Sequence, residues 1–167
     1  MKNKSVIWIA AVVVILLLLA GNSLVVTYPN EYTVIKEFGR IESIRQEPGL
    51  SIKVPFIQTA EKIQNEVLLY DLAISDVMTK DKKSMIADCF VLWKIEDPYK
   101  YTQTLSAQKG NAEFRIDTIV YNSLKNVISS LSQEEVISGR DGELAAAIKD
   151  NIGNTLEQYG ISLIAVE

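Results

Sequence analysis

Residues 6–26 read VIWIAAVVVILLLLAGNSLVV, and no charged residue occurs between Lys4 and Glu31. A helix rises ~1.5 Å per residue, so about 20 apolar residues cross a hydrocarbon core ~30 Å thick. The stretch is apolar on all sides, which is typical of a lipid-exposed helix. We therefore predict a transmembrane anchor over residues 6–26, after a short N-terminal segment, residues 1–5. The anchor residues that we single out are Val6, Trp8, Val13, Leu17, Leu19 and Val25.

A cleaved signal peptide is the alternative interpretation of this stretch. Such a peptide also begins with lysines and an apolar run, and Gly21-Asn22-Ser23 offers small residues for cleavage. However, the run from Val6 to Ala20 is as long as the apolar h-region of a signal peptide becomes, and Leu24 to Val26 continue it. The length favours an uncleaved anchor, and a processed, soluble extracytoplasmic binding domain is the alternative.

The charge distribution predicts the orientation of the chain and excludes one class of partner. Lys2 and Lys4 precede the apolar stretch, whereas mixed charges follow it, so the positive-inside bias places the N-terminus in the cytoplasm. We expect a single-pass protein of the plasma (inner) membrane with its domain on the extracytoplasmic side. Without these two lysines, the chain has 15 basic and 21 acidic residues, a net charge of −6. So acidic a domain lacks the basic surface of a nucleic-acid-binding protein.

The residues after the anchor predict an α+β domain over residues 27–167. Alternation of apolar and polar residues predicts short strands near residues 32–38, 41–44, 50–54 and 67–72, and a single long strand over 85–95. Apolar residues three and four apart predict a helix from Phe114 to Leu131 and another from Leu144 to Leu156. Ser132 to Glu135 match a capping box, and residues 161–166 predict a closing strand. We expect one antiparallel sheet with helices packed on one face.

Several motifs, taken in order, resemble the SPFH/Band 7 family of stomatins, prohibitins and flotillins. The matching motifs are EFGR at 37–40, EPGL at 47–50, VMTKDKK at 77–83 and VLWKIEDP at 91–98. Within this family the chain most resembles the HflC protease-modulator branch, on TKDKK at 79–83 and SGRDG at 138–142. The resemblance extends over nearly the whole chain.

The resemblance implies a non-enzymatic membrane scaffold. HflC-like proteins assemble with an HflK-like homologue and regulate an FtsH-type AAA+ protease, and a stomatin-like scaffold of membrane microdomains is the alternative within the family. Family members continue into a long C-terminal coiled coil, and this chain stops at Glu167. We therefore expect a fragment or a short form, with hetero-oligomers forming where the tail is present.

The residues themselves offer little for catalysis or for a cofactor. The sequence contains no histidine, so Ser-His-Asp and Cys-His sites and imidazole metal ligands are excluded. Cys89 falls on the apolar face of a predicted strand, where a small buried side chain is expected. Ser84 beside Lys82 and Lys83 could form a Ser-Lys pair, so a membrane-bound hydrolase is a third alternative. We predict no enzyme activity, no catalytic or metal residues and no cofactor.

The segment from Pro48 to Phe56 is the candidate for a second contact with lipid. It combines an apolar set of residues with turns at Pro48-Gly49 and Pro55, close in sequence to the anchor. In the family that the chain resembles, the corresponding loop dips into the outer leaflet. We predict that Leu50 and Phe56 touch lipid; burial of both in the domain core is the alternative.

Overall fold

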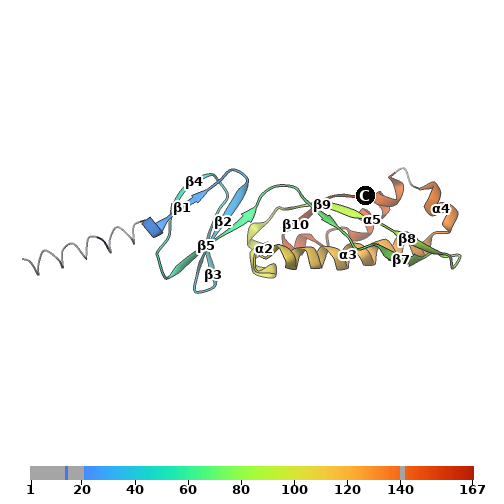
Figure 1. Cartoon of the computed structure of the whole chain (residues 1–167), viewed down its shortest axis with the longest axis horizontal. Coiled ribbons are helices and arrows are strands. Elements are labelled where there is room, and N and C mark those ends of the chain that lie inside the picture. Colours follow the sequence, from blue (N-terminus) through green and yellow to red (C-terminus); the bar gives the residue numbers. More distant parts are fainter. Residues whose placement is uncertain (1–13, 15–20, 140–141) are drawn as a thin grey trace, which may run out of the picture. The chain divides into compact units, whose positions relative to one another are not determined.

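The computed structural model describes residue 14, residues 21–139 and residues 142–167. This part of the chain divides into two compact units, one up to Gln64 and one from Asn65 to Glu167, and each is described by itself (Figure 1). Within these residues, none of the helices combines the length and the apolar character that a membrane crossing needs. The predicted anchor residues Val6, Trp8, Val13, Leu17 and Leu19 lie outside the described residues.

The first unit consists of two small antiparallel sheets. Strands β1 (Leu24–Thr27) and β4 (Gly49–Ile52) form one of them, and the other has the order β3-β2-β5. Its strands are β2 (Glu31–Glu37), β3 (Arg40–Arg45) and β5 (Gln58–Gln64). The central strand β2 buries consecutive residues, Thr33, Val34 and Ile35, because both of its faces are covered.

The second unit has a three-stranded antiparallel sheet of order β10-β9-β6 and a separate hairpin, β7-β8. The strands are β6 (Leu68–Asp71), β7 (Ser75–Met78), β8 (Ser84–Ala87), β9 (Phe90–Ile95) and β10 (Ile161–Val166). The helices are α2 (Pro98–Leu105), α3 (Lys109–Ser130), α4 (Gln133–Ser138), α5 (Glu143–Ile152) and the 3-10 helix η1 (Glu157–Tyr159).

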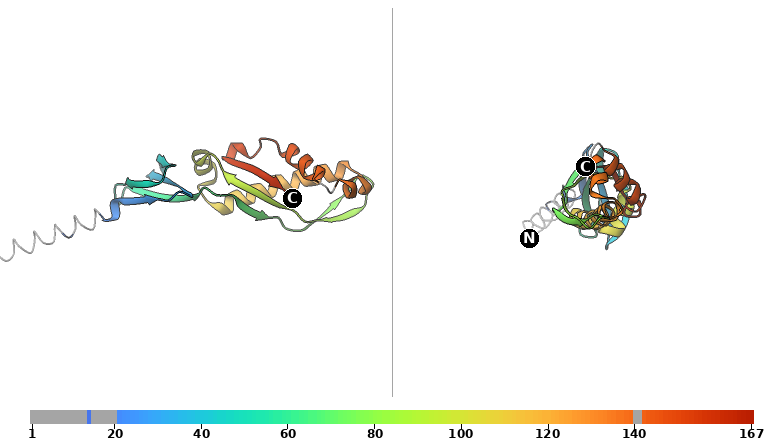
Figure 2. Two further views of the ribbon diagram at one scale, coloured as in Figure 1. Left: turned by 90° about the horizontal axis from the view of Figure 1, so that it is seen from above. Right: turned by 90° about the vertical axis from the view of Figure 1, so that its right-hand side faces the viewer.

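The core of the second unit lies between one face of its sheet and the helices. Val91, Trp93 and Ile95 alternate along the buried face of β9, and Ile116 and Val120 are fully buried on α3. Two views show α3 running along the sheet (Figures 1 and 2). The prediction of an α+β domain with helices on one sheet face therefore holds for this unit.

The tip of the β7-β8 hairpin contacts the junction of α3 and α4. The backbone N–H of Lys80 donates to the carbonyl of Leu131 at 2.8 Å, and the N–H of Gln133 donates to the carboxylate of Asp81 at 3.2 Å. Asp81 also accepts a hydrogen bond from Thr79 at 2.6 Å, which holds the turn together. These bonds fix the hairpin at a helix boundary.

Three predictions about elements are wrong. The single strand over 85–95 is two strands, because β8 pairs with β7 while β9 pairs with β6 and β10. The helix over 144–156 ends at Ile152, where Gly153 follows at φ +51°, and the buried Leu156 precedes η1. In place of the single predicted sheet, the described residues form four separate sheets.

Other expectations are confirmed at the level of single elements. Ser132 and Glu135 form the capping box of α4 reciprocally, side chain to backbone in both directions. The closing strand is β10, and the partner strand predicted near 67–72 is β6, which pairs with β9 with Leu68 opposite Trp93.

One residue of the predicted helix from Phe114 to Leu131 departs from its apolar stripe. Phe114 is 67% exposed and lies off the buried face of α3.

Candidate membrane-contact site

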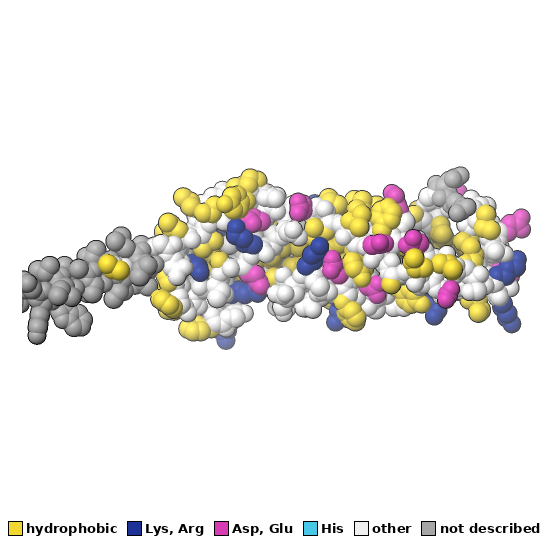
Figure 3. Space-filling model, viewed as in Figure 1, with side chains coloured by type: hydrophobic (Ala, Val, Ile, Leu, Met, Phe, Trp, Pro, Cys, Tyr) yellow, Lys and Arg dark blue, Asp and Glu magenta, His cyan; other side chains and the backbone are white. Residues whose placement is uncertain are grey.

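Strands β1 and β4 form a ribbon with one buried and one exposed face. Val25 and Ser51 are buried, and they lie opposite each other in the antiparallel register. The alternate positions point the other way and are all apolar and exposed; they are Leu24, Val26, Leu50 and Ile52. We call these four residues the ribbon face. Hydrophobic side chains line this region of the first unit in Figure 3.

The register of the ribbon joins the four residues into two cross-strand pairs. Leu24 lies opposite Ile52, and Val26 lies opposite Leu50. Leu50 and Ile52, the two residues from β4, are 74% and 75% exposed, so the described residues leave the β4 side of the face largely uncovered. Contiguous exposed apolar side chains of this kind indicate a surface that meets a partner or a membrane.

The turn after β4 extends the apolar surface. Its hydrogen bonds run from the N–H of Gln58 to the carbonyl of Val54 and from the N–H of Val54 to the side chain of Gln58, both at 2.9 Å. Phe56 is held in the left-handed region at φ +69° and is 90% exposed. A bulky residue in this region is strained, so its position is imposed by the turn and not by burial.

Ser23 connects this surface to the end of the charge-free stretch of sequence. The N–H of Lys53 donates to the carbonyl of Ser23 at 2.8 Å, and the hydroxyl of Ser23 donates to the carbonyl of Lys53 at 2.5 Å. Lys53 lies between Ile52 and the turn that carries Phe56. The end of the apolar stretch and the exposed turn are therefore held together.

The four residues of the ribbon face differ in their distance from Ser23. Ile52 and Leu24 are next to Ser23, whereas Leu50 and Val26 lie two residues farther along the ribbon. A strand rises ~3.3 Å per residue, so this step is about 7 Å. Ile52, which the sequence analysis did not single out, is therefore closer to Ser23 than Leu50 is.

The outcomes for the predicted site residues are mixed. Val25 belongs to strand β1 and is 7% exposed, so the prediction of a helical anchor continuing to Val26 is wrong. The strand forms because residues 24–27 pair with β4 over their whole length. Leu50 and Phe56 are exposed, so the alternative that they belong to the core is wrong. Their contact with lipid stays a prediction.

Two ion pairs join neighbouring strands of the three-stranded sheet. Lys36 pairs with Glu61, and Lys62 pairs with Glu31 at 2.6 Å. Burial acts to raise the pKa of Glu31, but the hydrogen bond from Lys62 and the N–H of Tyr28 outweigh it and lower the pKa. These pairs connect β2 to β5.

The structure shows the surroundings of the two residues that were considered for catalysis, Ser84 and Cys89. Ser84 is exposed on β8, and the ammonium of neighbouring Lys83 lies 3.1 Å from the carboxylate of Asp81. Cys89 is buried, and burial, together with the charges of Asp88 and Asp71, raises the pKa of its thiol. A raised thiol pKa disfavours the nucleophilic thiolate.

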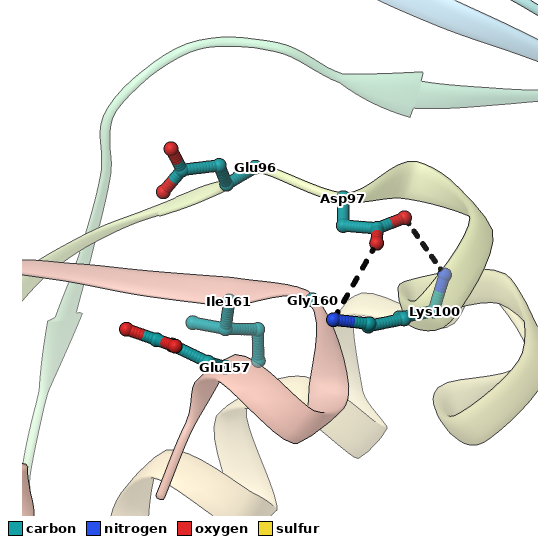
Figure 4. A pocket seen from close by; sticks show the side chains of 6 residues that line it. All are labelled: Glu96, Asp97, Lys100, Glu157, Gly160 and Ile161. Atoms are coloured by element: carbon teal, nitrogen blue, oxygen red, sulfur yellow. Dashed lines mark hydrogen bonds and ion pairs between the residues drawn. The ribbon is translucent and has the colours of Figure 1, made fainter. Parts of the chain in front are cut away.

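A hollow of about 250 Å³ lies where β9, α2 and β10 meet (Figure 4). Asp97 accepts hydrogen bonds from the N–H groups of Tyr99 and Lys100, which caps α2, and its carboxylate is 3.8 Å from the ammonium of Lys100. Gly160 closes the hollow through its carbonyl, which accepts from the N–H groups of Glu96 and Asp97. These polar groups therefore cap α2 and hold the loop between β9 and α2 against Gly160.

Comparison with known proteins identifies the family of the chain. The model of the SPFH domain / Band 7 family matches residues 25–167. The chain belongs to this family. The matched region begins at Val25, inside β1, so the ribbon and both units are parts of the family domain.

Several relatives carry the HflC name, and two of them are described here. "Modulator of FtsH protease HflC" of Escherichia coli K12 is 26% identical over 159 residues, which cover 91% of this chain and 47% of that protein. "Protein HflC" of Buchnera aphidicola subsp. Baizongia pistaciae is 31% identical over 125 residues, 70% of this chain and 38% of that protein.

An archaeal relative extends the comparison. An uncharacterized protein of Archaeoglobus fulgidus is 28% identical over 162 residues, 96% of this chain and 61% of that protein. The chain spans about half the length of the Escherichia coli relative.

Proposed function

We propose that this SPFH-family chain is a single-pass membrane scaffold without catalytic activity, which modulates an FtsH-type AAA+ protease together with an HflK-like homologue. Membership of the family and the names of the HflC relatives support the assignment. In this proposal, residues 1–5 lie in the cytoplasm, the anchor precedes β1, and the SPFH domain faces the extracytoplasmic side of the inner membrane.

The observation that carries the proposal is the position of the ribbon face. Exposed apolar residues of β1 and β4 adjoin Ser23, where a sequence without charge from residue 5 onward reaches the domain. A membrane at that end would cover apolar surface that the described residues leave in water. A soluble binding domain released by cleavage near Ser23 would keep this surface exposed, which disfavours that alternative.

The function is tested by purification of the full chain from crosslinked, detergent-solubilised membranes. We expect an HflK-like homologue and an FtsH-type protease to copurify, and degradation of a membrane substrate of the protease to change when the chain is removed. Ser84→Ala is the matched control for the hydrolase alternative, and we expect it to leave both results unchanged. Recovery of the chain without any protease would contradict the proposal.

A further inference from the structure

Strand β10 covers one edge of β9 and ends before it reaches β8. The N–H of Phe90, the first residue of β9, donates to the carbonyl of Glu167 at 2.7 Å, and the N–H of Glu167 donates to the carbonyl of Phe90 at 2.9 Å. Figure 2 shows the hairpin of β7 and β8 continuing past the point where β10 reaches the C-terminus. Strand β8 pairs with β7 on one edge, and within the described residues no strand pairs with its other edge.

The unpaired edge of β8 carries free backbone hydrogen-bonding groups. The carbonyl groups of Lys83 and Cys89 each accept, at 3.0 Å, from an N–H on the side of β6 and β7. Because backbone groups point alternately to the two edges of a strand, those of Ser84, Ile86 and Asp88 point to the edge that β10 occupies beside β9. Among the residues that the structure describes, no other element bonds to them. We call these backbone groups the β8 edge.

A hollow of about 470 Å³ adjoins the β8 edge. Asp88 and Cys89, which follow β8, line it together with the end of β10 and with residues of α3 and α5. Leu124, Leu144 and Ile148 make its helix walls apolar. Cys89 is buried, so the hollow lies on the helix-covered side of the strands. Alternate side chains of a strand placed in line with β10 would therefore point into it.

The charge beside the hollow is negative. Asp88 and Glu167 are exposed residues of its lining, and neither carboxylate forms an ion pair within the described part of the chain. Among the described residues, none of those that line the hollow is basic. A ligand that carries a basic side chain next to its apolar positions is therefore complementary to this site.

We propose that the β8 edge binds an extended peptide segment of a partner protein, which adds as a further strand in line with β10. Backbone hydrogen bonds to Ser84, Ile86 and Asp88 provide the affinity, and alternate apolar side chains of the peptide that enter the hollow provide the selectivity. A basic residue of the peptide lies beside Asp88 and Glu167. This peptide site goes beyond the scaffold function proposed above and does not depend on it.

The site is tested with the full chain in detergent and a fluorescent peptide in which valine and threonine alternate between terminal lysines. We expect saturable binding by fluorescence anisotropy, and no binding of a peptide of the same composition whose valines are adjacent. N-methylation of one alternate set of the peptide amides should abolish binding, and methylation of the other set should not, because only one set faces β8. Equal binding of both methylated peptides would overturn strand addition.

Ile86→Pro tests the edge from the side of the protein. Ile86 is 74% exposed and its N–H points away from β7, so proline removes an outward donor and leaves the pairing with β7 in place. We expect this variant to lose peptide binding and Ile86→Thr, the matched control, to retain it. Chemical denaturation shows whether both variants are folded.

Ala145→Phe blocks the site by an independent route, because it fills the hollow from α5. We expect this variant to lose peptide binding while the β8 edge is unchanged. A folded Ala145→Phe chain that binds the peptide as tightly as the unchanged chain overturns the role of the hollow.

Hydrogen exchange identifies the edge that the peptide covers. We expect the peptide to slow the exchange of the amides of Ser84, Ile86 and Asp88 and to leave those of Met85 and Ala87, which face β7, unchanged. Binding that leaves the exchange of Ser84 and Ile86 unchanged overturns the proposal. Protection of these amides without peptide, at high but not at low protein concentration, also overturns it, because a second copy of the chain then occupies the edge.

The charge preference is tested by Asp88→Asn with Glu167→Gln. Because an exposed ion pair contributes little, we expect this variant to bind the lysine-ended peptide about fivefold more weakly. A peptide with terminal glutamines is the matched control, and both chains should bind it equally. An equal loss of affinity for the two peptides overturns the preference for a basic residue.

Discussion

Gly160 lies at the end of η1, where the loop between β9 and α2 comes closest to it. A Cβ atom at this position would lie 2.2 Å from the carbonyl oxygen of Asp97 and 2.8 Å from the backbone nitrogen of Tyr101, and the φ of +73° is unfavourable for any other residue. The contact is backbone against backbone, so no flexible side chain can yield. From the sequence, only the closing strand that begins after Gly160 was predicted; the close approach depends on packing.

Gly160→Ala should therefore lower the free energy of unfolding on the order of 3 kcal/mol, through steric overlap and backbone strain. Chemical denaturation of the full chain in detergent measures the change. Gly110→Ala is the matched control, because a Cβ atom there meets open space in the first turn of α3 and should be neutral or stabilising. Equal stability of the two variants would contradict the packing described for Gly160.

Asp81 gives the β7-β8 hairpin a dependence on pH. The hydrogen bond from Thr79, with further contributions from Lys83 and the N–H of Gln133, lowers the pKa of Asp81 from 3.8 to about 2. Because the folded pKa is depressed, this stabilisation is present above pH 3.8 and is lost as the pH falls through about 2.

Asp81→Asn should therefore be less stable than the unchanged chain at neutral pH, and the difference should shrink as the pH is lowered from 3.8 to about 2. Urea denaturation over this pH range measures both chains. A difference that stays constant down to the lowest pH would show that the carboxylate charge does not hold the hairpin to the end of α3.

At the scale of elements, the positions of single strands were predicted better than the pairing between strands. Alternation identified β6 and β9, but it could not show that Ala87 ends one strand and Phe90 begins another, because Met85, Ala87, Cys89 and Val91 keep the same alternation through the break. Helix α2 was missed although Asp97-Pro98 is a cap followed by proline at the first turn, a signal readable from sequence.

The ribbon could not be predicted for a different reason. Leu24 to Val26 are as apolar as the residues before them, so hydropathy assigned them to the anchor. Only the pairing with residues 50–52, far along the chain, makes them a strand. The exposure of Leu50 and Phe56 was likewise open, because an apolar residue in a short strand fits a core as well as a membrane surface.

The ribbon predicts opposite effects for neighbouring positions. Leu50→Asp with Phe56→Asp should change the free energy of unfolding little, because both side chains are exposed. Val25→Asp, the control in the same ribbon, should cost about 3 kcal/mol, because it buries an unpaired charge. Chemical denaturation in detergent compares them. Strong destabilisation by the double change would mean that the ribbon face is covered within the protein.

At the scale of the whole molecule, the proposed function places the SPFH domain outside the cytoplasm. Lys2 and Lys4 precede the apolar stretch, and the positive-inside bias predicts this orientation from them. A reporter that is active only in the cytoplasm, fused after Glu167, should be inactive, and the same reporter fused before Met1 should be active. The reverse result would place the domain on the cytoplasmic side.

Alkaline carbonate extraction of membranes tests most directly whether the chain is held in the bilayer. The account predicts that the full chain stays in the pellet, because residues 6–23 contain no charge. Val13→Lys with Leu17→Lys is the control; a charge at the centre of a spanning helix costs about 3 kcal/mol, so this variant should move to the supernatant. Release of the unchanged chain into the supernatant would contradict the membrane scaffold.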